Sequence, residues 1–283
     1  MNVAWDFNGS GYNHKVAHAD TAYYDRSVNP SILTRPALAC WQKSGDSARL
    51  WILFTGVNKD MYLGYLDPAD ENQPFEAVRT HFYNGQQHAQ VGTETSLRSP
   101  ALAPQGTTLR LGWVGQTNKY IYINATTTGN TFINRNIDST NTADAGFGMT
   151  VWCVGSQCKV WIAFTGTNSP HYIYFEYFNL NAATWTNTAH PSNDTTCAKC
   201  DLTLVLQSGT LRIPYSGTSF GVPLNVDNST NGSTWNNDPS VPPAGSIWGG
   251  GAAVNGTNHF WISFPNYNSL DPNNLQIIQF QYN

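Results

Sequence analysis

A six-residue pattern occurs five times in this chain and constrains its fold more than any other feature. It is clearest as Trp-Ile-Ala-Phe-Thr-Gly at residues 161–166. The first position holds Trp or Arg, the second an aliphatic residue and the fourth an aromatic, and Gly follows two places later in four of the five copies. The aromatic residues are Phe54, Trp113, Phe164, Tyr215 and Phe264. A spacing of about 50 residues is typical of repeat proteins, in which each unit is one supersecondary piece.

Other strand-like segments surround each copy of the pattern. A short apolar run precedes it, at residues 35–40, 99–103, 149–153, 202–206 and 251–254. A run rich in β-branched and aromatic residues follows it, at residues 61–65, 120–123, 172–175, 224–226 and 275–280. A further aromatic position marks a fourth segment in four repeats, at Phe75, Phe132, Trp185 and Trp235. Such runs predict strands, and no apolar helical period occurs, so we predict an all-β chain with four strands in each repeat.

The two ends of the chain match one repeat between them. The last repeat has no fourth segment before Asn283, whereas Ala4-Trp5 resembles Thr184-Trp185 near the start. We therefore predict a single-domain, five-bladed β-propeller whose N-terminal strand completes the last blade, because closure protects strand edges. Residues 8–30 are then expected to be a loop. The predicted blades are residues 33–97, 98–146, 147–200, 201–245, and 246–283 plus 1–7.

The fourth repeat carries a resemblance to a known family. Tyr-Ser-Gly-Thr at residues 215–218 leads to a short strand at residues 224–226 and then to Gly-Ser-Thr-Trp at residues 232–235. This arrangement resembles the five-bladed, tachylectin-2-like propeller lectins and related bacterial repeats. The resemblance implies a non-catalytic, multivalent, sugar-binding propeller with several similar shallow sites, and glycans or glycoconjugates as partners. Fold alone does not determine function, because propellers also include hydrolases.

An enzyme is the main alternative, and it is disfavoured by the distribution of carboxylates. Glycosidases need two carboxyl groups, one to protonate the leaving oxygen and one to act as nucleophile or base. In five-bladed arabinanase- and invertase-like enzymes these groups lie on the first strands, where this chain has no Asp or Glu. The sialidase pattern also fits poorly, since Thr230 stands where its Asp would be. A glycoside-active enzyme would have to use Asp60, Asp70, Glu71 or Asp138 from loops, and a protein-interaction propeller is the remaining alternative.

Composition narrows the possible partners and the cell compartment. Charged residues make up 11% of the 283 residues, aromatic residues 13%, and the formal net charge is −4. This balance leaves no basic face for nucleic acid. The apolar runs are far shorter than the roughly 20 residues of a membrane-spanning helix, so no membrane insertion is predicted. No signal peptide opens the chain, yet a mature secreted protein would look the same, and we expect a secreted protein.

Cysteine and histidine spacing does not predict a metal centre or any cofactor. Cys153–Cys158 brackets a hairpin turn, and Cys197–Cys200 lies between repeats. Two local disulfides are favoured, while a four-cysteine zinc site and free thiols remain alternatives. Cys40 is expected to be a buried free thiol. Residues 6–17 resemble a calcium loop, but Ala17 stands where the bidentate Glu is required.

The predicted ligand site lies in the connections between the second and third strands and between blades. Amide groups there offer a donor and an acceptor together, which suits sugar hydroxyls. Turn chemistry alone also explains asparagine after glycine. No catalytic residue is predicted, and a structural role is favoured for Arg110 and Arg212. The candidate ligand-binding residues are Asn58, Asn118, Asn168, Ser219, Trp248, Tyr83, His88 and His190.

Overall fold

The structure is a computed structural model, and it describes residues 13–17, 23–27, 34–56, 59–66, 88–167, 171–188, 201–216, 224–238, 251–255, 259–265 and 275–281. These residues form six sheets and no helix. Five of the sheets correspond to the five repeats, so the prediction of an all-β chain is confirmed. The chain divides into two compact units, Met1–Ser139 and Thr140–Asn283, which are described separately below.

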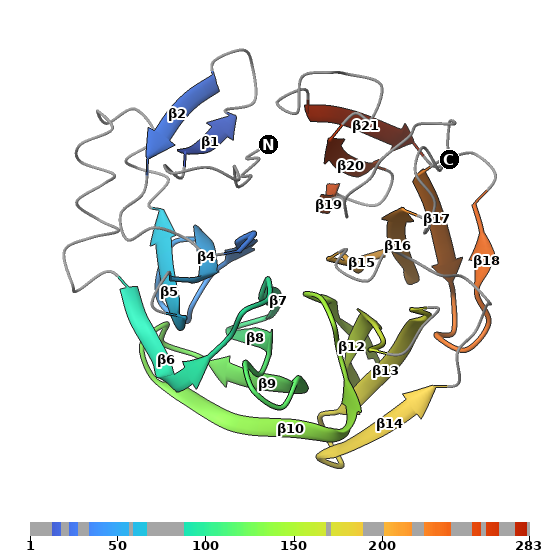
Figure 1. Cartoon of the computed structure of the whole chain (residues 1–283), viewed down its shortest axis with the longest axis horizontal. Helices are drawn as coiled ribbons and strands as arrows, with labels where there is room; N and C mark the ends of the chain where they lie inside the picture. The colour runs from blue at the N-terminus through green and yellow to red at the C-terminus, as the bar shows by residue number, and fades with distance from the viewer. Residues whose placement is uncertain are drawn as a thin grey trace. The chain divides into compact units, whose positions relative to one another are not determined.

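The first unit contains three sheets (Figure 1). A two-stranded sheet comes first, followed by two four-stranded sheets in which consecutive strands are neighbours. The first strands of the two four-stranded sheets lie beside each other. The strands are β1 (Asn13–Ala17) and β2 (Tyr23–Ser27); β3 (Ala37–Trp41), β4 (Arg49–Thr55), β5 (Asp60–Leu66) and β6 (His88–Thr95); and β7 (Ala101–Gln105), β8 (Thr108–Val114), β9 (Tyr120–Thr126) and β10 (Phe132–Thr142).

The second unit contains two four-stranded sheets and one three-stranded sheet. Consecutive strands are again neighbours, and the first strands of successive sheets lie side by side. The strands are β11 (Gly148–Val154), β12 (Gln157–Thr165), β13 (Ile173–Asn179) and β14 (Thr184–Thr188); β15 (Val205–Gln207), β16 (Thr210–Ser216), β17 (Leu224–Ser229) and β18 (Asn236–Asn237); and β19 (Gly251–Asn255), β20 (His259–Pro265) and β21 (Leu275–Gln281).

The recurrent six-residue pattern forms the second strand of each repeat. It lies in β4, β8, β12, β16 and β20, each paired antiparallel with the strands before and after it. Two-residue turns join the first two strands of three repeats, at 106–107, 155–156 and 208–209. Gly106, Gly155 and Gly209 have positive φ values of 52°, 59° and 77° at these turns. Tight hairpins need this conformation, and glycine adopts it without steric cost.

Two predictions about strand position are wrong. Residues 8–30 are not a loop throughout, because β1 and β2 pair within them, Lys15 opposite Asp25. Their polar sequence lacks the apolar alternation that marks the other strands. The fourth strand of the first repeat is β6, which pairs with β5. The segment around Phe75, predicted to be that strand, lies outside the described residues.

The prediction of five blades is not confirmed. The β1–β2 hairpin is a sixth sheet that corresponds to none of the five repeats. Trp5, predicted to complete the last blade, lies outside the described residues. Within the described residues the last sheet has three strands, β19, β20 and β21.

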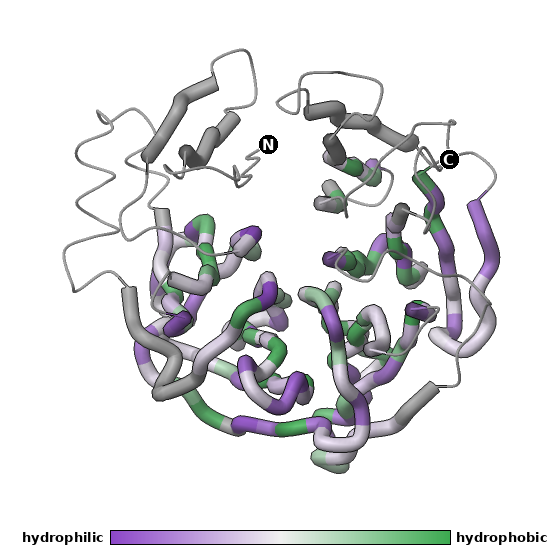
Figure 2. The backbone as a smooth tube through the Cα atoms, in the orientation of Figure 1, coloured by the Kyte–Doolittle hydropathy of each residue, from purple (hydrophilic) through white to green (hydrophobic). Residues whose placement is uncertain are grey.

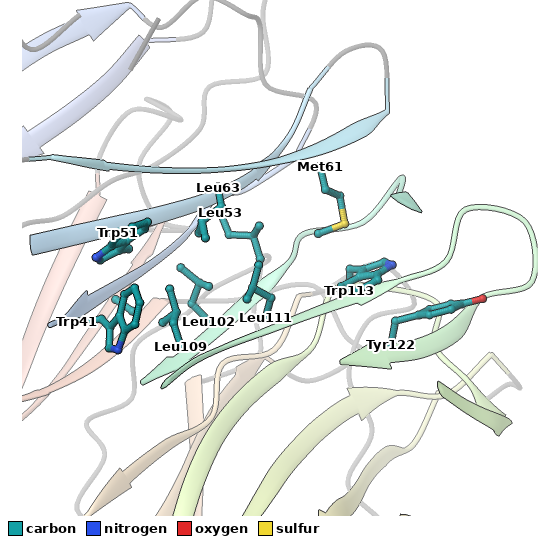
Figure 3. Close-up of a cluster of buried hydrophobic side chains, with 11 residues drawn as sticks. Trp41, Trp51, Leu53, Met61, Leu63, Leu102, Leu109, Leu111, Trp113 and Tyr122 are labelled. Atoms are coloured by element: carbon teal, nitrogen blue, oxygen red, sulfur yellow. The ribbon is translucent and has the colours of Figure 1, made fainter. Parts of the chain in front are cut away.

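Tryptophan and leucine form the core of the first unit (Figure 3). Residues that alternate along β8, namely Leu109, Leu111 and Trp113, are each fully buried. They pack with Trp41, Trp51, Leu53, Met61, Leu63, Leu102 and Tyr122. This cluster joins the second and third sheets, because its members come from β3, β4 and β5 on one side and β7, β8 and β9 on the other. Burial of apolar surface stabilises a fold by about 25 cal/mol per Å², so such a cluster is the main source of stability.

The outer strand β10 is longer than the strand it pairs with. Its hydrophobic residues are Phe132, Ile133 and Ile137, and hydrophilic residues separate and follow them (Figure 2). Ile133 and Ile137 are 43% and 40% exposed, whereas Asp138 is buried. The last residues of β10, from Thr140 on, belong to the second unit. In that unit Ala143, which follows β10, forms an isolated β-bridge with Gly166, which follows β12.

Among the described residues, two cysteines form a disulfide and one is a free thiol. Cys153 and Cys158 face each other across β11 and β12 and form a disulfide. This pairing agrees with one of the two predicted local disulfides and removes both thiols from a zinc site. Cys197 and Cys200 lie outside the described residues. Cys40 is exposed, contrary to expectation, because Ala39 and Trp41 occupy the buried side of β3 and Cys40 points to the other.

Candidate functional site

In three repeats the turn between the second and third strands is closed by a hydrogen bond from the amide of the recurrent glycine. In the turn between β8 and β9, the Gly115 amide donates to the Tyr120 carbonyl at 2.9 Å, and the Lys119 amide donates to the Gly115 carbonyl at 3.1 Å. The turn between β4 and β5 repeats this pattern with Gly56, Lys59 and Asp60. In the turn between β12 and β13, the Gly166 amide donates to the Tyr172 carbonyl at 3.1 Å. We call these three segments the closed turns.

Each closed turn holds a basic residue in the left-handed backbone region. Lys59, Lys119 and His171 have φ values of 72°, 59° and 63°. This conformation costs a non-glycine residue roughly 1–2 kcal/mol. Lys59 and Lys119 are exposed, and His171 is half-buried with its Nδ1 3.2 Å from the Gly166 carbonyl. Strained residues of this kind persist where the surrounding structure holds them, and they gather at functional sites.

A stacked aromatic pair lies directly beside each closed turn. The rings of Phe54 and Tyr62 are 5.5 Å apart, as are those of Trp113 and Tyr122 and those of Phe164 and Tyr174. Each pair faces across neighbouring strands, and offset stacking of this kind contributes about 0.5–1.5 kcal/mol beyond burial. A side chain on Gly115 would collide with Tyr122, and one on Gly166 with Tyr174. The recurrent glycine therefore leaves room for the tyrosine.

Asn118 is the one predicted amide residue whose side chain the structure describes. Its Nδ2 donates to the Tyr122 hydroxyl at 2.7 Å, and its Oδ1 accepts from the Tyr120 amide at 3.1 Å. Asn118 therefore fixes both the turn and the tyrosine hydroxyl. This role agrees with the alternative interpretation of the sequence, in which the asparagine after the glycine stabilises the turn. The hydrogen bond also places the Tyr122 hydroxyl at the turn.

The structure tests few of the other predicted ligand residues. Tyr62, Tyr122 and Tyr174 were missed, although a tyrosine six to eight residues after each recurrent glycine was a usable signal. His88 was predicted in a loop between blades, but it lies in β6 opposite Gly64, because β6 is displaced along the chain. The residues outside the described ranges are Asn58, Tyr83, Asn168, His190, Ser219 and Trp248.

The opposite end of the sheets carries two arginine–glutamine pairs. Arg110 donates through Nε and Nη2 to Gln105 Oε1 at 3.1 and 3.0 Å. Arg212 donates through Nε to Gln207 Oε1 at 2.9 Å and through Nη1 to Asp238 Oδ2 at 3.1 Å. Burial lowers the pKa of the Arg110 guanidinium below its usual value. The sequence placed these arginines in the tryptophan position but did not reveal their partners.

Tryptophan replaces arginine in the first and third repeats. Trp51 packs 4.9 Å from Trp41 and 5.1 Å from Tyr65, with the Arg49 guanidinium 4.3 Å above the tyrosine ring. Trp161 packs 4.8 Å from Tyr177, and Lys159 Nζ lies 4.0 Å above that ring. A cation therefore lies over each of these tyrosine rings, as the Arg135 guanidinium lies over the Tyr122 ring at 5.0 Å.

Two acidic side chains in the strands of the second unit form hydrogen bonds in the interior. Glu176 is 1% exposed and accepts from Asn141 Nδ2 at 2.9 Å. Asp227 is 2% exposed and lies 3.4 Å from the Tyr215 hydroxyl, which donates to it. Asp60 and Asp138, suggested as loop carboxylates, lie in β5 and β10. In the described residues, the first strands of the five repeats contain no carboxylate.

No group of three or more metal-binding side chains occurs within the described ranges. The same residues include no helix long and apolar enough to cross a membrane.

Comparisons with known proteins relate the chain to others by structure alone. No family description matches the sequence, and no curated protein matches it. The fungal, fucose-recognising lectin of Aleuria aurantia, a six-bladed β-propeller, matches with a TM-score of 0.60 at 11% identity over 95% of this chain and 83% of the lectin. The GH93 α-L-arabinofuranosidase of Fusarium graminearum in complex with arabinobiose matches with a TM-score of 0.57 at 11% identity, over 96% of this chain and 85% of the enzyme.

These similarities concern the fold, because the identities are too low to carry function. The structural neighbours are propeller lectins and glycosidases, and they do not support the five-bladed, tachylectin-2-like type in particular. With its all-β meander sheets and these neighbours, the chain has a β-propeller fold.

Proposed function

We propose that this chain is a non-catalytic, carbohydrate-binding propeller, with several similar shallow sites at the closed turns. The observation that carries the proposal is the recurrence of a left-handed basic residue beside a stacked tyrosine in three repeats. A structural requirement alone would favour glycine at these positions, which adopts positive φ at no steric cost. Lysine or histidine at these positions therefore supports a binding role.

The chemistry of a closed turn suits a glycan. The ammonium groups of Lys59 and Lys119 supply donors, and the exposed side chain of Asn118, whose Nδ2 donates to the Tyr122 hydroxyl, supplies an amide. Donors and acceptors of this kind match the paired hydroxyls of a sugar ring. We propose that Asn58, Asn168, Ser219, Tyr83, His190 and Trp248 extend these sites. Several weak sites acting together would give useful avidity on a glycan surface.

A secreted location is part of the same proposal. The Cys153–Cys158 disulfide supports it, since disulfides persist in oxidising compartments and are rare in the cytosol.

Sugar-bound neighbours support the lectin proposal, and the buried carboxylates weigh against catalysis. A mutant of the Aleuria lectin is known in complex with Fucα1-6GlcNAc. A glycosidase needs two carboxyl groups that reach the substrate, whereas the described first strands of the five repeats contain none, and Glu176 and Asp227 are each at most 2% exposed.

The proposal is tested on a glycan array probed with the full chain, followed by calorimetry on the best ligand. Saturable binding without release of product is expected. Binding to no glycan would refute the proposal. Turnover of arabinan, fructan or sialyl substrates would establish the enzyme instead, and capture of a protein partner without any glycan would indicate an interaction propeller.

Glycine at the closed turns is expected to raise stability and weaken binding. Replacing Lys119 by glycine removes a left-handed strain of roughly 1–2 kcal/mol but adds the chain entropy of glycine, about 0.5–1 kcal/mol. We expect a net gain of about 0.5–1 kcal/mol, measured by urea unfolding, together with weaker glycan binding. Lys59→Gly should behave alike, whereas His171→Gly should gain less because it also loses the contact between Nδ1 and the Gly166 carbonyl.

Ala183→Gly is the matched control. Ala183 is also left-handed, with φ 53°, but lies in the turn between β13 and β14, at the other end of its sheet. It should gain similar stability and bind glycan normally. If Lys119→Gly also binds normally, the closed turns are not the ligand sites.

A further inference from the structure

The two arginine–glutamine pairs are alike in position but differ in charge balance. Arg110 and Arg212 each occupy the first position of the recurrent pattern, and each has a glutamine five residues earlier at the end of the first strand. In both pairs the guanidinium Nε donates to the glutamine Oε1. The shared geometry allows one pair to be used as a reference for the other.

The pair in the fourth repeat contains its own anion. Arg212 Nη1 donates to Asp238 Oδ2 at 3.1 Å, and both side chains are about nine-tenths buried. The Arg212–Asp238 contact therefore shows that a carboxylate can accept from Nη1 of a guanidinium whose Nε donates to glutamine. A carboxylate suits that edge because charge-assisted hydrogen bonds are stronger than neutral ones.

The pair in the second repeat lacks that anion. Asp238 lies six residues after Gly232, and the residue six places after the equivalent Gly129 is Arg135. The Arg135 guanidinium lies 5.0 Å above the Tyr122 ring. Within the described residues, Arg110 has hydrogen bonds to Gln105 and no carboxylate partner.

The second repeat also leaves this pair accessible. Arg110 and Gln105 are half-buried and lie beside the exposed turn residues Gly106 and Thr107, whereas Arg212 and Gln207 are buried. Partial burial without a counter-ion makes the charge of Arg110 costly, in keeping with the lowered pKa of its guanidinium. A bound anion would offset that cost.

We propose that the Arg110–Gln105 pair is a binding site for an anionic group, the carboxylate of a uronic acid or the sulfate ester of a sugar. The anion takes the place that Asp238 holds beside Arg212 and accepts from the Nη1 edge of the guanidinium. This site lies at the hairpin end of its sheet, opposite the closed turns, and does not depend on them. Its ligand differs from theirs in requiring a negative charge.

The test titrates the full chain with methyl β-D-glucuronide, galactose 6-sulfate and methyl β-D-glucoside, observed by NMR of the arginine Nε–H signals. The two anions should shift the Arg110 signal saturably, and the neutral glucoside should not. The glucuronide and the sulfate separate the two sources of the anion. If neither shifts that signal, or if the glucoside shifts it equally, the proposal is wrong.

Three variants locate the effect. Arg110→Gln removes the charge, and Gln105→Glu keeps the arginine but supplies an internal carboxylate where Oε1 already accepts. Binding to the variants is measured by calorimetry, because Arg110→Gln has no Arg110 Nε–H signal. Each of these two variants should weaken binding of the anions at least about ten-fold, the loss expected for one charge-assisted hydrogen bond. Lys119→Gln, at the opposite end of the sheet, should leave anion binding unchanged. Retained binding in Gln105→Glu, confirmed as folded by its melting curve, would overturn the proposal.

Failure here is distinguishable from failure of the proposed function. Loss of neutral glycan binding in Lys119→Gln, with anion binding intact, would support both sites. Anion binding that is lost in Lys119→Gln and kept in Arg110→Gln would assign the anion to the closed turns and refute the Arg110 site.

Discussion

Alanine at Gly232 is expected to lower the free energy of unfolding by about 2–5 kcal/mol. Gly232 has φ +76°, and a side chain there would overlap the ring of Trp161. The left-handed conformation costs alanine about 1–2 kcal/mol, and overpacking a rigid core costs typically about 1–3 kcal/mol more. Urea unfolding of the variant measures the loss. Gly129→Ala should behave alike, because Gly129 has φ +86° and lies against Trp51.

Gly209→Ala separates the two causes. Gly209 belongs to the same sheet and has φ +77°, but nothing lies within 4 Å of the position its side chain would take. This variant should lose only the conformational part, about 1–2 kcal/mol. Equal losses in Gly232→Ala and Gly209→Ala would mean that the contact with Trp161 contributes nothing.

The recurrent pattern predicted the second strands because its information is local. Alternating apolar residues and a following glycine are enough to indicate β4, β8, β12 and their equivalents. The contact between Gly232 and Trp161 could not be predicted in the same way, since it joins neighbouring sheets that are far apart in sequence. The sequence shows the glycine in a turn but not the ring that covers it.

The errors in the fold have similar physical origins. The β1–β2 hairpin lacks an apolar face in its sequence, so no alternation distinguished it from a loop. Cys40 was assigned to the core from its apolar neighbours, although strand alternation places it opposite Ala39 and Trp41. Successive side chains of a strand point to opposite faces, so the position of a residue within that alternation decides whether it is buried.

The candidate site was predictable in position but not in detail. The loops after the second strands were identified from their asparagines, and Asn118 does lie in such a turn. Its side chain holds Tyr122, and the exposed basic residue is the neighbouring Lys119. A positive φ at lysine cannot be predicted from its type, since lysine rarely adopts it.

Arg110 and Arg212 illustrate the same limit for charges. Both arginines occupy the first position of the recurrent pattern, in different repeats. The fold brings Asp238 to Arg212 and not to Arg110. The pairing decides whether each arginine is structural or available to a ligand.

Removal of the Asp238 carboxylate is expected to destabilise the second unit strongly. Asp238→Ala removes the carboxylate to which the Arg212 guanidinium, which is 8% exposed, donates through Nη1. Breaking a buried ion pair from one side costs typically about 3–5 kcal/mol, because an uncompensated charge remains in the interior. Arg212→Met should cost a similar amount, and both losses are measured by urea unfolding.

The double replacement Arg212→Met with Asp238→Leu should recover most of this loss. Replacing both charges by apolar groups of similar size is often neutral, so the two single losses should not add. Arg110→Met provides the control, since Arg110 is half-buried and has no carboxylate partner in the described residues, and its loss should stay near about 1 kcal/mol. If the two single losses at Arg212 and Asp238 instead add, their ion pair is energetically unimportant, and Asp238 is a poor template for an anion at Arg110.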